Sequence, residues 1–291
     1  MSIVLTRPEV RHASSVEEAV GWLAELGAGA APLAGGTWVM RAEQRGEPLT
    51  QTYVALGRVP ELRAVTGTDP VVVGALTTHT ALAGLAGPPA LDALRQAAHH
   101  SAFPQVRNVA TLGGNIGARG FVEADLVPAL LALEARLVLA GPDGRATVDL
   151  TNYLADRDAR PAGEIIVAAE LPVATTRRSG YARLTVRGGG EYAIASVAIS
   201  VDAAADGTVT DARVAVGSVE PLARRCPAAE AALRGAPLSA VTARAAGAAA
   251  AAECSPRSGL DAPGWYRTAV LPGLFERAAT RAGHDVVTTE A

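Results

Sequence analysis

The apolar residues of the chain recur at different spacings, and each spacing predicts a type of element. Residues 15–26 (SVEEAVGWLAEL) repeat apolar side chains at the three- and four-residue intervals of a helix. Ser15 and Glu18 have the spacing of a capping box, and Gly27 follows the last turn as a stop signal. The chain is therefore predicted to open with a helix, and the following segment APLAGG (31–36) reads as a short strand that enters a glycine turn.

Strand and helix patterns then alternate as far as residue 172. The patterns predict strands at 52–59, 64–76 and 164–172, helices at 77–98 (interrupted at 87–89) and 124–134, and a hairpin over 135–150 with its turn at 142–144. These elements are expected to form a first domain over residues 1–175.

The pattern changes after Tyr181. Three strand-like segments at 181–187, 192–204 and 207–219 precede two helical stretches at 227–251 and 262–282. This order predicts a smaller α+β domain over 176–285, a three-stranded sheet with helices, followed by a tail at 286–291. The polar and basic segment 175–180 (TTRRSG) is predicted to link the two domains.

Composition excludes several classes of function. The 291 residues carry a formal net charge of −3 and no basic block, so we expect no nucleic-acid binding. All 26 basic residues are Arg. The absence of Lys excludes a pyridoxal Schiff base and a Walker-A phosphate site. A phosphate would have to be bound by backbone N–H groups, hydroxyls or Arg.

The cysteines and the apolar runs narrow the class further. Cys226 and Cys254 are too few for an iron–sulfur cluster, and their spacing matches no zinc site. The longest apolar stretch, residues 126–141, is too short and too charged to span a membrane. With no apolar leader at the start of the sequence, a cytoplasmic location is expected.

A repeated Gly-Gly pair is the main candidate for a binding site. The segments APLAGGTW (31–38) and RNVATLGGNIG (107–117) each place an apolar stub before two glycines. Backbone N–H groups in such turns can form an anion site, and two facing turns would suit a pyrophosphate. Thr37, Thr111 and Asn115 would add side-chain donors, and no G-x-G-x-x-G is present at either place, which disfavours a Rossmann fold.

PLAGGTW and QVRNVATLGGNI, in this order and spacing, resemble the two FAD-binding signatures of the flavin subunit of molybdenum hydroxylases. This is the medium chain of the carbon monoxide dehydrogenase and xanthine dehydrogenase families. The resemblance extends through DLVPALLALEARL, EIIVAAELP, YARLTVRGGGEYAIASVAISV and SGLDAPGWYRTAVLPGLFERA. It implies a vanillyl-alcohol-oxidase/PCMH-type FAD-binding domain, with lobes at about 1–57 and 58–175, and an α+β C-terminal domain.

The resemblance also implies which residues bind the cofactor. The pyrophosphate would be wrapped by Pro32, Leu33, Ala34, Gly35, Gly36, Thr37 and Trp38 together with Ala110, Thr111, Leu112, Gly113, Gly114 and Asn115. Asp125 would hold the ribose or adenine end, and Ile166 would contact the flavin. Arg183 and Tyr192 would lie near the isoalloxazine ring, Tyr192 as its cover.

Three positions depart from the family pattern. Trp38 replaces a small, acidic or aliphatic residue, and the loop 118–125 (ARGFVEAD) is about one residue longer than usual. Arg183 replaces Lys, which keeps the charge but changes its geometry. Arg183 and Arg187 are predicted to share a strand face beside the reduced flavin, or alternatively to be the charges of an exposed edge strand.

The implied function is an FAD-binding electron-transfer subunit of a molybdopterin-containing oxidoreductase. It would take electrons from a [2Fe-2S] subunit and pass them to an external acceptor, beside a molybdopterin-binding large subunit, in a dimer of heterotrimers. One alternative is a free-standing FAD-dependent oxidase or dehydrogenase that recruits His99, His100 or Glu123 as acid or base. The other is a scaffold subunit that has lost efficient FAD binding.

Overall fold

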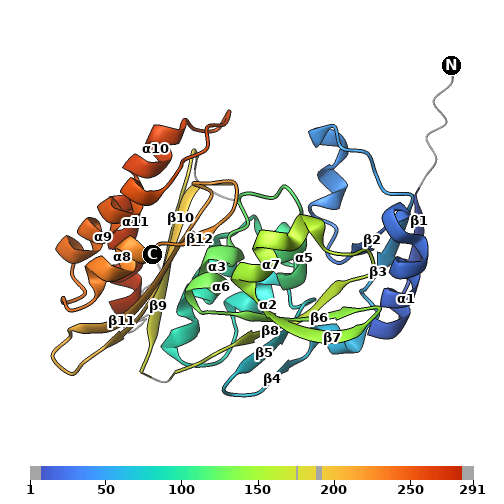
Figure 1. Cartoon of the computed structure of the whole chain (residues 1–291), viewed down its shortest axis with the longest axis horizontal. Helices are drawn as coiled ribbons and strands as arrows, with labels where there is room; N and C mark the ends of the chain where they lie inside the picture. Colours follow the sequence, from blue (N-terminus) through green and yellow to red (C-terminus); the bar gives the residue numbers. More distant parts are fainter. Residues whose placement is uncertain (1–7, 175, 188–191, 284–291) are drawn as a thin grey trace.

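The structure of the chain is a computed structural model that describes residues 8–174, 176–187 and 192–283. The predicted tail at 286–291 lies outside the described residues. The N-terminal lobe and the C-terminal helices lie at opposite ends of the molecule, with the largest sheet between them (Figure 1).

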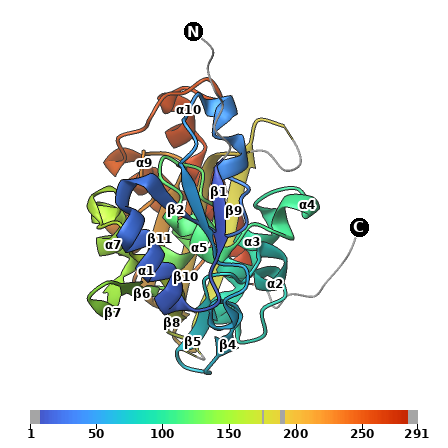
Figure 2. The same ribbon diagram turned by 90° about the vertical axis from the view of Figure 1, so that its right-hand side faces the viewer.

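The N-terminal lobe is a parallel sheet of three strands in the order β1-β3-β2. Its strands are β1 (Glu9–His12), β2 (Ala30–Leu33) and β3 (Thr52–Ala55), and helix α1 (Val16–Leu26) crosses from β1 to β2. Figure 2 views this lobe from the front, with α1 beside the strands. The start of α1 has one of the two hydrogen bonds of the predicted Ser15–Glu18 capping box. Ser15 Oγ accepts from the Glu18 N–H at 3.1 Å, but the Glu18 carboxylate accepts from Ser14 at 2.7 Å rather than from Ser15.

The second lobe is built on an antiparallel sheet of five strands in the order β4-β5-β8-β6-β7. The strands are β4 (Val65–Thr66), β5 (Val71–Gly74), β6 (Arg136–Gly141), β7 (Gly144–Asp149) and β8 (Ile165–Leu171). The helices are α2 (His79–Ala83), α3 (Asp92–His100), α4 (Pro104–Arg107), α5 (Leu112–Gly117), α6 (Leu126–Ala132) and α7 (Leu150–Asp156). The predicted hairpin is β6–β7, and Ile165 and Val167 of β8 join the core that α1 and β3 form in the first lobe.

The C-terminal sheet is antiparallel in the order β12-β11-β10-β9, so it has one strand more than predicted. The strands are β9 (Arg178–Thr185), β10 (Ala193–Ala203), β11 (Val209–Gly217) and β12 (Arg224–Arg225), and the helices are α8 (Pro227–Leu233), α9 (Ala240–Glu253), α10 (Gly264–Ala269) and α11 (Leu271–Gly283). The extra strand, β12, has two residues, too few to show as a pattern in the sequence.

Both faces of the C-terminal sheet are buried. Val197 and Ile199 pack in the core with α8, α9 and α11, whereas Tyr181, Ala198 and Ala215 belong to the core of the second lobe, beneath α3 and α6. A sheet covered on both sides needs apolar residues at successive positions. This explains the nine consecutive buried residues of β10.

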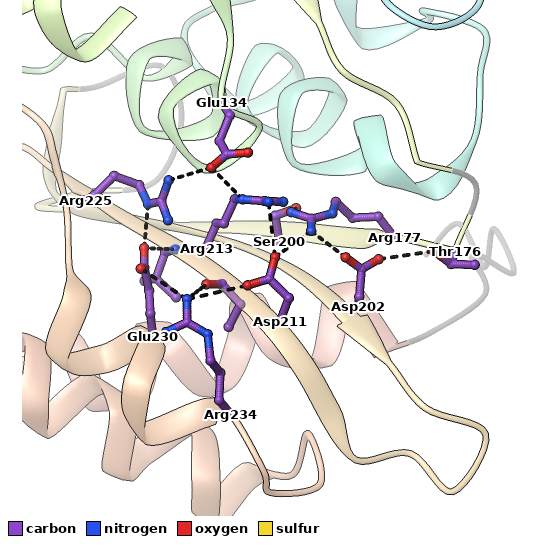
Figure 3. A network of polar contacts seen from close by, with 12 residues as sticks. Glu134, Thr176, Arg177, Ser200, Asp202, Asp211, Arg213, Arg225, Glu230 and Arg234 are labelled. Atoms are coloured by element: carbon purple, nitrogen blue, oxygen red, sulfur yellow. Dashed lines mark hydrogen bonds and ion pairs between the residues drawn. The ribbon is translucent and has the colours of Figure 1, made fainter. Parts of the chain in front are cut away.

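The segment predicted as a linker lies between β8 and the first residues of β9, and its Arg177 and Ser179 are buried. Arg177 pairs with Asp202 and Asp211, the latter at 2.8 Å, and Ser179 Oγ accepts from the Ala93 N–H at 2.8 Å. Figure 3 shows Arg177 at one end of a charged network on the sheet. Residue 175 itself lies outside the described residues.

The same network links the second lobe to the C-terminal sheet. Glu134, just after α6, accepts from Arg213 Nε at 2.7 Å and lies 3.4 Å from Arg225 Nη1 (Figure 3). Glu230 is buried and accepts from Arg225 and from the Val214 N–H. Arg177, Arg213 and Arg225 of this sheet region are therefore each paired with a carboxylate.

Candidate cofactor site

A cavity of about 850 Å³ lies where the two N-terminal lobes and the C-terminal sheet meet. Its volume is within the range of about 300–1,000 Å³ that is usual for ligand pockets. All of the predicted cofactor-binding residues line it except Leu33, Leu112 and Arg183. Leu112 instead packs in the core of the second lobe, fully buried.

The first Gly-Gly pair forms an open loop directly after β2. A Cβ on Gly35 would lie 1.8 Å from the Val109 carbonyl oxygen, so the loop touches the second signature through bare backbone. Gly36 has φ 73°, a left-handed conformation that suits glycine. Within the described part of the chain, the backbone N–H groups of residues 35–38 donate to no protein acceptor. This loop therefore offers a run of donors to an anion.

The second Gly-Gly pair is not the bare turn that the sequence predicts. Gly113 and Gly114 lie in the first turn of α5, whose N-cap Thr111 accepts from the Gly114 N–H at 3.2 Å. The Leu112 and Gly113 N–H groups donate to the carbonyls of Thr77 and Ala75, at 3.0 and 2.8 Å. These N–H groups are thus used within the protein. The second signature lines the cavity but does not provide a second set of free donors.

The glycines of α5 bring this wall close to its neighbours. A Cβ on Gly113 would lie 2.8 Å from the Ala75 Cβ, and one on Gly114 would lie 2.9 Å from Thr111 Oγ1. Asn115 is buried and its Oδ1 accepts from the Leu126 N–H at 3.2 Å. The Asn115 side chain lines the cavity, so its amide is placed between α6 and the ligand space.

Asp125 is fixed at the back of the cavity by two residues of β9. The Tyr181 hydroxyl donates to Asp125 Oδ1, and Arg183 Nη1 lies 3.2 Å from Asp125 Oδ2. Complete burial raises the pKa of Asp125 to about 6, although Arg183 and the Tyr181 hydroxyl act in the opposite direction. The carboxylate is thus tied to the C-terminal sheet as well as facing the ligand space.

Arg183 does not line the large cavity, which differs from the predicted place beside the flavin. It pairs with Asp125, donates to the His100 carbonyl oxygen and lines a second, smaller cavity. Arg187, predicted on the same face, is exposed at the surface. Strand alternation predicted both arginines on one face, but α3 packs on β9, and Asp125, which lines the large cavity, contacts the Arg183 guanidinium.

An aromatic cluster lines the mouth of the large cavity. Trp38 stacks on Phe121 with ring centroids 4.5 Å apart, and Tyr192 meets Phe121 edge-on at 5.6 Å. Arg45 lies 3.7 Å from the Trp38 ring centroid, and Arg41 Nη1 donates to the Tyr192 hydroxyl at 2.7 Å. The departures from the family pattern at Trp38 and in 118–125 therefore meet in one contact.

Sequence reasoning missed Arg41, Arg45, Phe121 and His79. His79 is buried at the cavity, where its Nδ1 bonds Ser101 Oγ at 2.6 Å and its Nε2 has no partner within the described residues. Burial lowers the pKa of His79 to about 4, so its ring is neutral at pH 7. The spacing of Arg41 and Arg45 from Trp38, three and seven residues, was the available signal for two of them.

Comparison with known protein families identifies the family of this chain. Residues 6–174 match the model of the FAD binding domain in molybdopterin dehydrogenase, and residues 181–282 match the CO dehydrogenase flavoprotein C-terminal domain. The chain belongs to this flavoprotein family. Its cofactor is FAD, and it is an oxidoreductase subunit.

Relatives match this family member nearly end to end. The carbon monoxide dehydrogenase medium chain of Hydrogenophaga pseudoflava is 32% identical over 283 residues, covering 95% of this chain and 97% of that one. The nicotine 6-hydroxylase medium subunit of Paenarthrobacter nicotinovorans is 30% identical, covering 95% and 98%. Reconstituted CO dehydrogenase from Oligotropha carboxidovorans has a chain that superposes with a TM-score of 0.87 at 30% identity, covering 95% and 97%. The predicted α+β fold class and the FAD cofactor are confirmed.

The cavity fits FAD on its own geometry. It has dinucleotide size, a loop with free N–H donors at 35–38, and a glycine wall at 113–114 that added Cβ atoms would push against its neighbours. Within the described part of the chain, no group of three or more His, Cys, Asp or Glu residues could hold a metal ion. No helix there is both long and apolar enough to cross a bilayer.

Proposed function

We propose that this flavoprotein transfers electrons from a [2Fe-2S] subunit to an external acceptor, in a complex with a molybdopterin-binding large subunit. The observation that carries the proposal is the large cavity, which combines the free backbone N–H donors of residues 35–38 with an aromatic cluster at its mouth. FAD supplies reversible electron transfer when it is bound. With two cysteines, the chain has too few ligands for an iron–sulfur cluster of its own.

Different residues of the cavity would bind different parts of FAD. The N–H groups of 35–38 would hold the pyrophosphate, and Asp125 would accept hydrogen bonds from the ribose or adenine end. Tyr192, Trp38 and Phe121 would restrict solvent access to the ring, and Ile166 would pack against it. Arg41, within bonding distance of Tyr192, would supply the positive charge assigned by sequence to Arg183.

The residues considered as acid or base for a free-standing enzyme do not line this cavity. Glu123 is paired with Arg257 at 2.5 Å, and burial lowers the pKa of the lining residue His79 to about 4, which makes it a weak base. His99 and His100 lie at the second cavity instead. Substrate oxidation is therefore assigned to the large subunit, and this chain binds and positions its cofactor.

A reconstitution experiment tests this function. The FAD-loaded chain alone should stay oxidised with small organic substrates and should be reduced when the iron–sulfur and molybdopterin proteins of the same gene cluster are added with their substrate. Flavin absorbance near 450 nm reports the reduction. Substrate-dependent bleaching of the isolated chain would instead support a free-standing enzyme, and absence of bound FAD would support a scaffold.

The assembly and location are part of the same proposal. We expect a dimer of heterotrimers, which a native mass measurement of the co-expressed proteins tests. Cys226 and Cys254 are both free thiols, which suits the reducing cytoplasm.

A further inference from the structure

A second cavity, of about 270 Å³, lies between the two domains beside the FAD site. It is lined by His99, His100, Ala102, Arg107, Arg183, Thr185 and Arg281. These residues come from the end of α3, the segment between α3 and α4, the last residue of α4, strand β9 and the last turns of α11. The cavity shares only Ala102 with the lining of the FAD cavity, and it is below the usual size of a drug-sized ligand pocket.

The lining concentrates positive charge without a carboxylate. Within the described residues, neither Arg107 nor Arg281 has a carboxylate partner within 4.0 Å. Arg183 also lines the cavity, but its charge is balanced by Asp125 from behind. Among the described residues, the charges of Arg107 and Arg281 at this cavity are therefore not compensated by a carboxylate.

Each of these two arginines is held in place by a backbone carbonyl. Arg107 Nη1 donates to the Ala102 oxygen at 2.6 Å, and Arg281 Nη1 donates to the Tyr181 oxygen at 2.5 Å. Both arginines line the cavity, and each of these bonds engages one nitrogen of the guanidinium group. Fixed guanidinium forks are suited to the oxygens of phosphates.

Burial and the positive charge at this cavity lower the pKa values of the groups beside it. Burial lowers the pKa of His100 to about 4, and Arg281, His99, Arg183 and Arg107 lower it further in the same direction. Burial also lowers the pKa of Arg281, with Arg277 adding repulsion. The imidazole of His100 is thus neutral at pH 7, and the positive charge that remains belongs to the arginines.

The donor set defines the ligand. Arginines and histidines supply the donors of this lining, since the Thr185 hydroxyl donates to the Arg187 carbonyl oxygen, and no Asp or Glu is among the described residues that line the cavity. A compact anion with several acceptor oxygens and two charges would satisfy these donors and offset the repulsion.

We propose that this cavity binds a phosphate group as its dianion, either inorganic phosphate or a small phosphate monoester. The site is separate from the pyrophosphate of FAD, and it does not depend on the electron-transfer function. Binding would tie α11 and β9 of the C-terminal domain to the end of α3 and to α4 in the second lobe.

Calorimetric titration of the FAD-saturated protein tests the site, since the pyrophosphate loop is then filled. Inorganic phosphate and glycerol phosphate form the two arms, each at constant ionic strength against chloride. Saturable binding is expected in at least one arm, and the tighter arm identifies the source of the phosphate. No binding in either arm, or binding only to FAD-free protein, would overturn the proposal.

Charge-removing variants locate the binding. Arg281→Gln and Arg107→Gln should each weaken phosphate binding about tenfold or more, because each removes charge-assisted hydrogen bonds. Arg244→Gln is the matched control, an exposed arginine on α9 paired with Glu276 at 2.8 Å, and should change affinity less than twofold. Equal affinities in all four proteins would refute the assignment, and Arg107→Gln suffices if Arg281→Gln does not fold.

The titration of His100 gives an independent readout. A bound anion offsets the positive field, so phosphate should raise the His100 pKa measured by NMR. The His12 ring, outside the cavity, should not respond. An unchanged His100 pKa at saturating phosphate would contradict the site.

Discussion

At the scale of single residues, the two glycines of the first signature have different physical roles. Gly35 is needed for close approach, since its Cβ would lie 1.8 Å from the Val109 oxygen. Gly36 is needed for its left-handed φ of 73°, and a Cβ there would meet only ordinary contacts at 3.7 and 3.8 Å. Gly35 is therefore required because there is no space for a side chain, and Gly36 is required because of its backbone conformation.

Gly35→Ala should remove most of the bound FAD, because the loop must move away from the second signature. Gly36→Ala should keep FAD and lower the free energy of unfolding by about 1–2 kcal/mol. The ratio of flavin to protein and urea denaturation measure the two effects. Full flavin content in Gly35→Ala would contradict the packing of the loops.

Asp125 gives the stability of the FAD-free protein a specific pH dependence. Its pKa is raised from 3.8 to about 6, so between these values the folded protein binds more protons than the unfolded chain. Stability contributed by this group is therefore present at low pH and is lost as the pH rises through this window. Asp125→Asn cannot titrate.

The free energy of unfolding of Asp125→Asn, relative to wild type, should rise by about 2–3 kcal/mol between pH 4 and pH 7. Urea denaturation at several pH values measures the difference, and titrations common to both proteins cancel. A difference that does not vary with pH would mean that Asp125 titrates normally.

The sequence identifies residues whose chemistry is local. Gly-Gly pairs, Asp125 and Tyr192 stand in recognisable motifs, and all of them line the large cavity. The direction of Arg183 could not be read in this way, because it depends on which helices cover β9. Likewise, the N–H groups of Leu112 and Gly113 are used because distant carbonyls at Thr77 and Ala75 accept from them, which the local sequence does not show.

At the scale of elements, the loop before α10 is held by a fully buried arginine. Arg267 donates to the carbonyl oxygens of Ile194 at 2.6 Å and Ser218 at 3.2 Å, and pairs with Asp261 at 2.6 Å. It thus joins β10, the end of β11 and the loop in one contact. The closing motif SGLDAPGWYRTAV contains both members of this ion pair.

Arg267→Met should lower the free energy of unfolding by about 3–5 kcal/mol, since it leaves buried carbonyls and Asp261 without their partner. Denaturant unfolding followed by Trp265 fluorescence measures the loss. Arg244→Gln serves as the surface control and should change stability by less than about 1 kcal/mol. A cost below that level for Arg267→Met would show that water replaces the arginine.

Element types were predictable where the apolar period was regular. The helix at 15–26, the hairpin at 135–150 and the long strands of the C-terminal sheet follow from sequence. β12 is too short to have a period, and α5 contains two glycines, which favour turns over helices. Its helix exists because Thr111 caps it and because Ala75 and Thr77 accept its first N–H groups.

At the scale of the whole molecule, the domains are joined by packing and by charge. α3 and α6 pack on the C-terminal sheet, and Glu134 bridges to Arg213 and Arg225 at its edge (Figure 3). The Glu134 side chain is 45% exposed, so water and salt screen its ion pairs.

Glu134→Gln should therefore lower the free energy of unfolding by less than about 1 kcal/mol, and the loss should shrink in 1 M salt. Paired denaturation curves at low and high salt measure it. A loss that persists in high salt would indicate that Glu134 acts through packing or through its positive φ of 54° instead of its charge.

The Asp125–Arg183 pair stands as a shared wall between two cavities. Asp125 lines the large cavity proposed for FAD and Arg183 lines the proposed phosphate site, with 3.2 Å between their charged atoms. A phosphate that draws Arg183 toward itself weakens the hold on Asp125 beside the cofactor. Thermodynamic reciprocity then requires FAD to change phosphate affinity by the same factor as phosphate changes FAD affinity. A single ion pair would make this redox subunit sensitive to the phosphate supply of the cell.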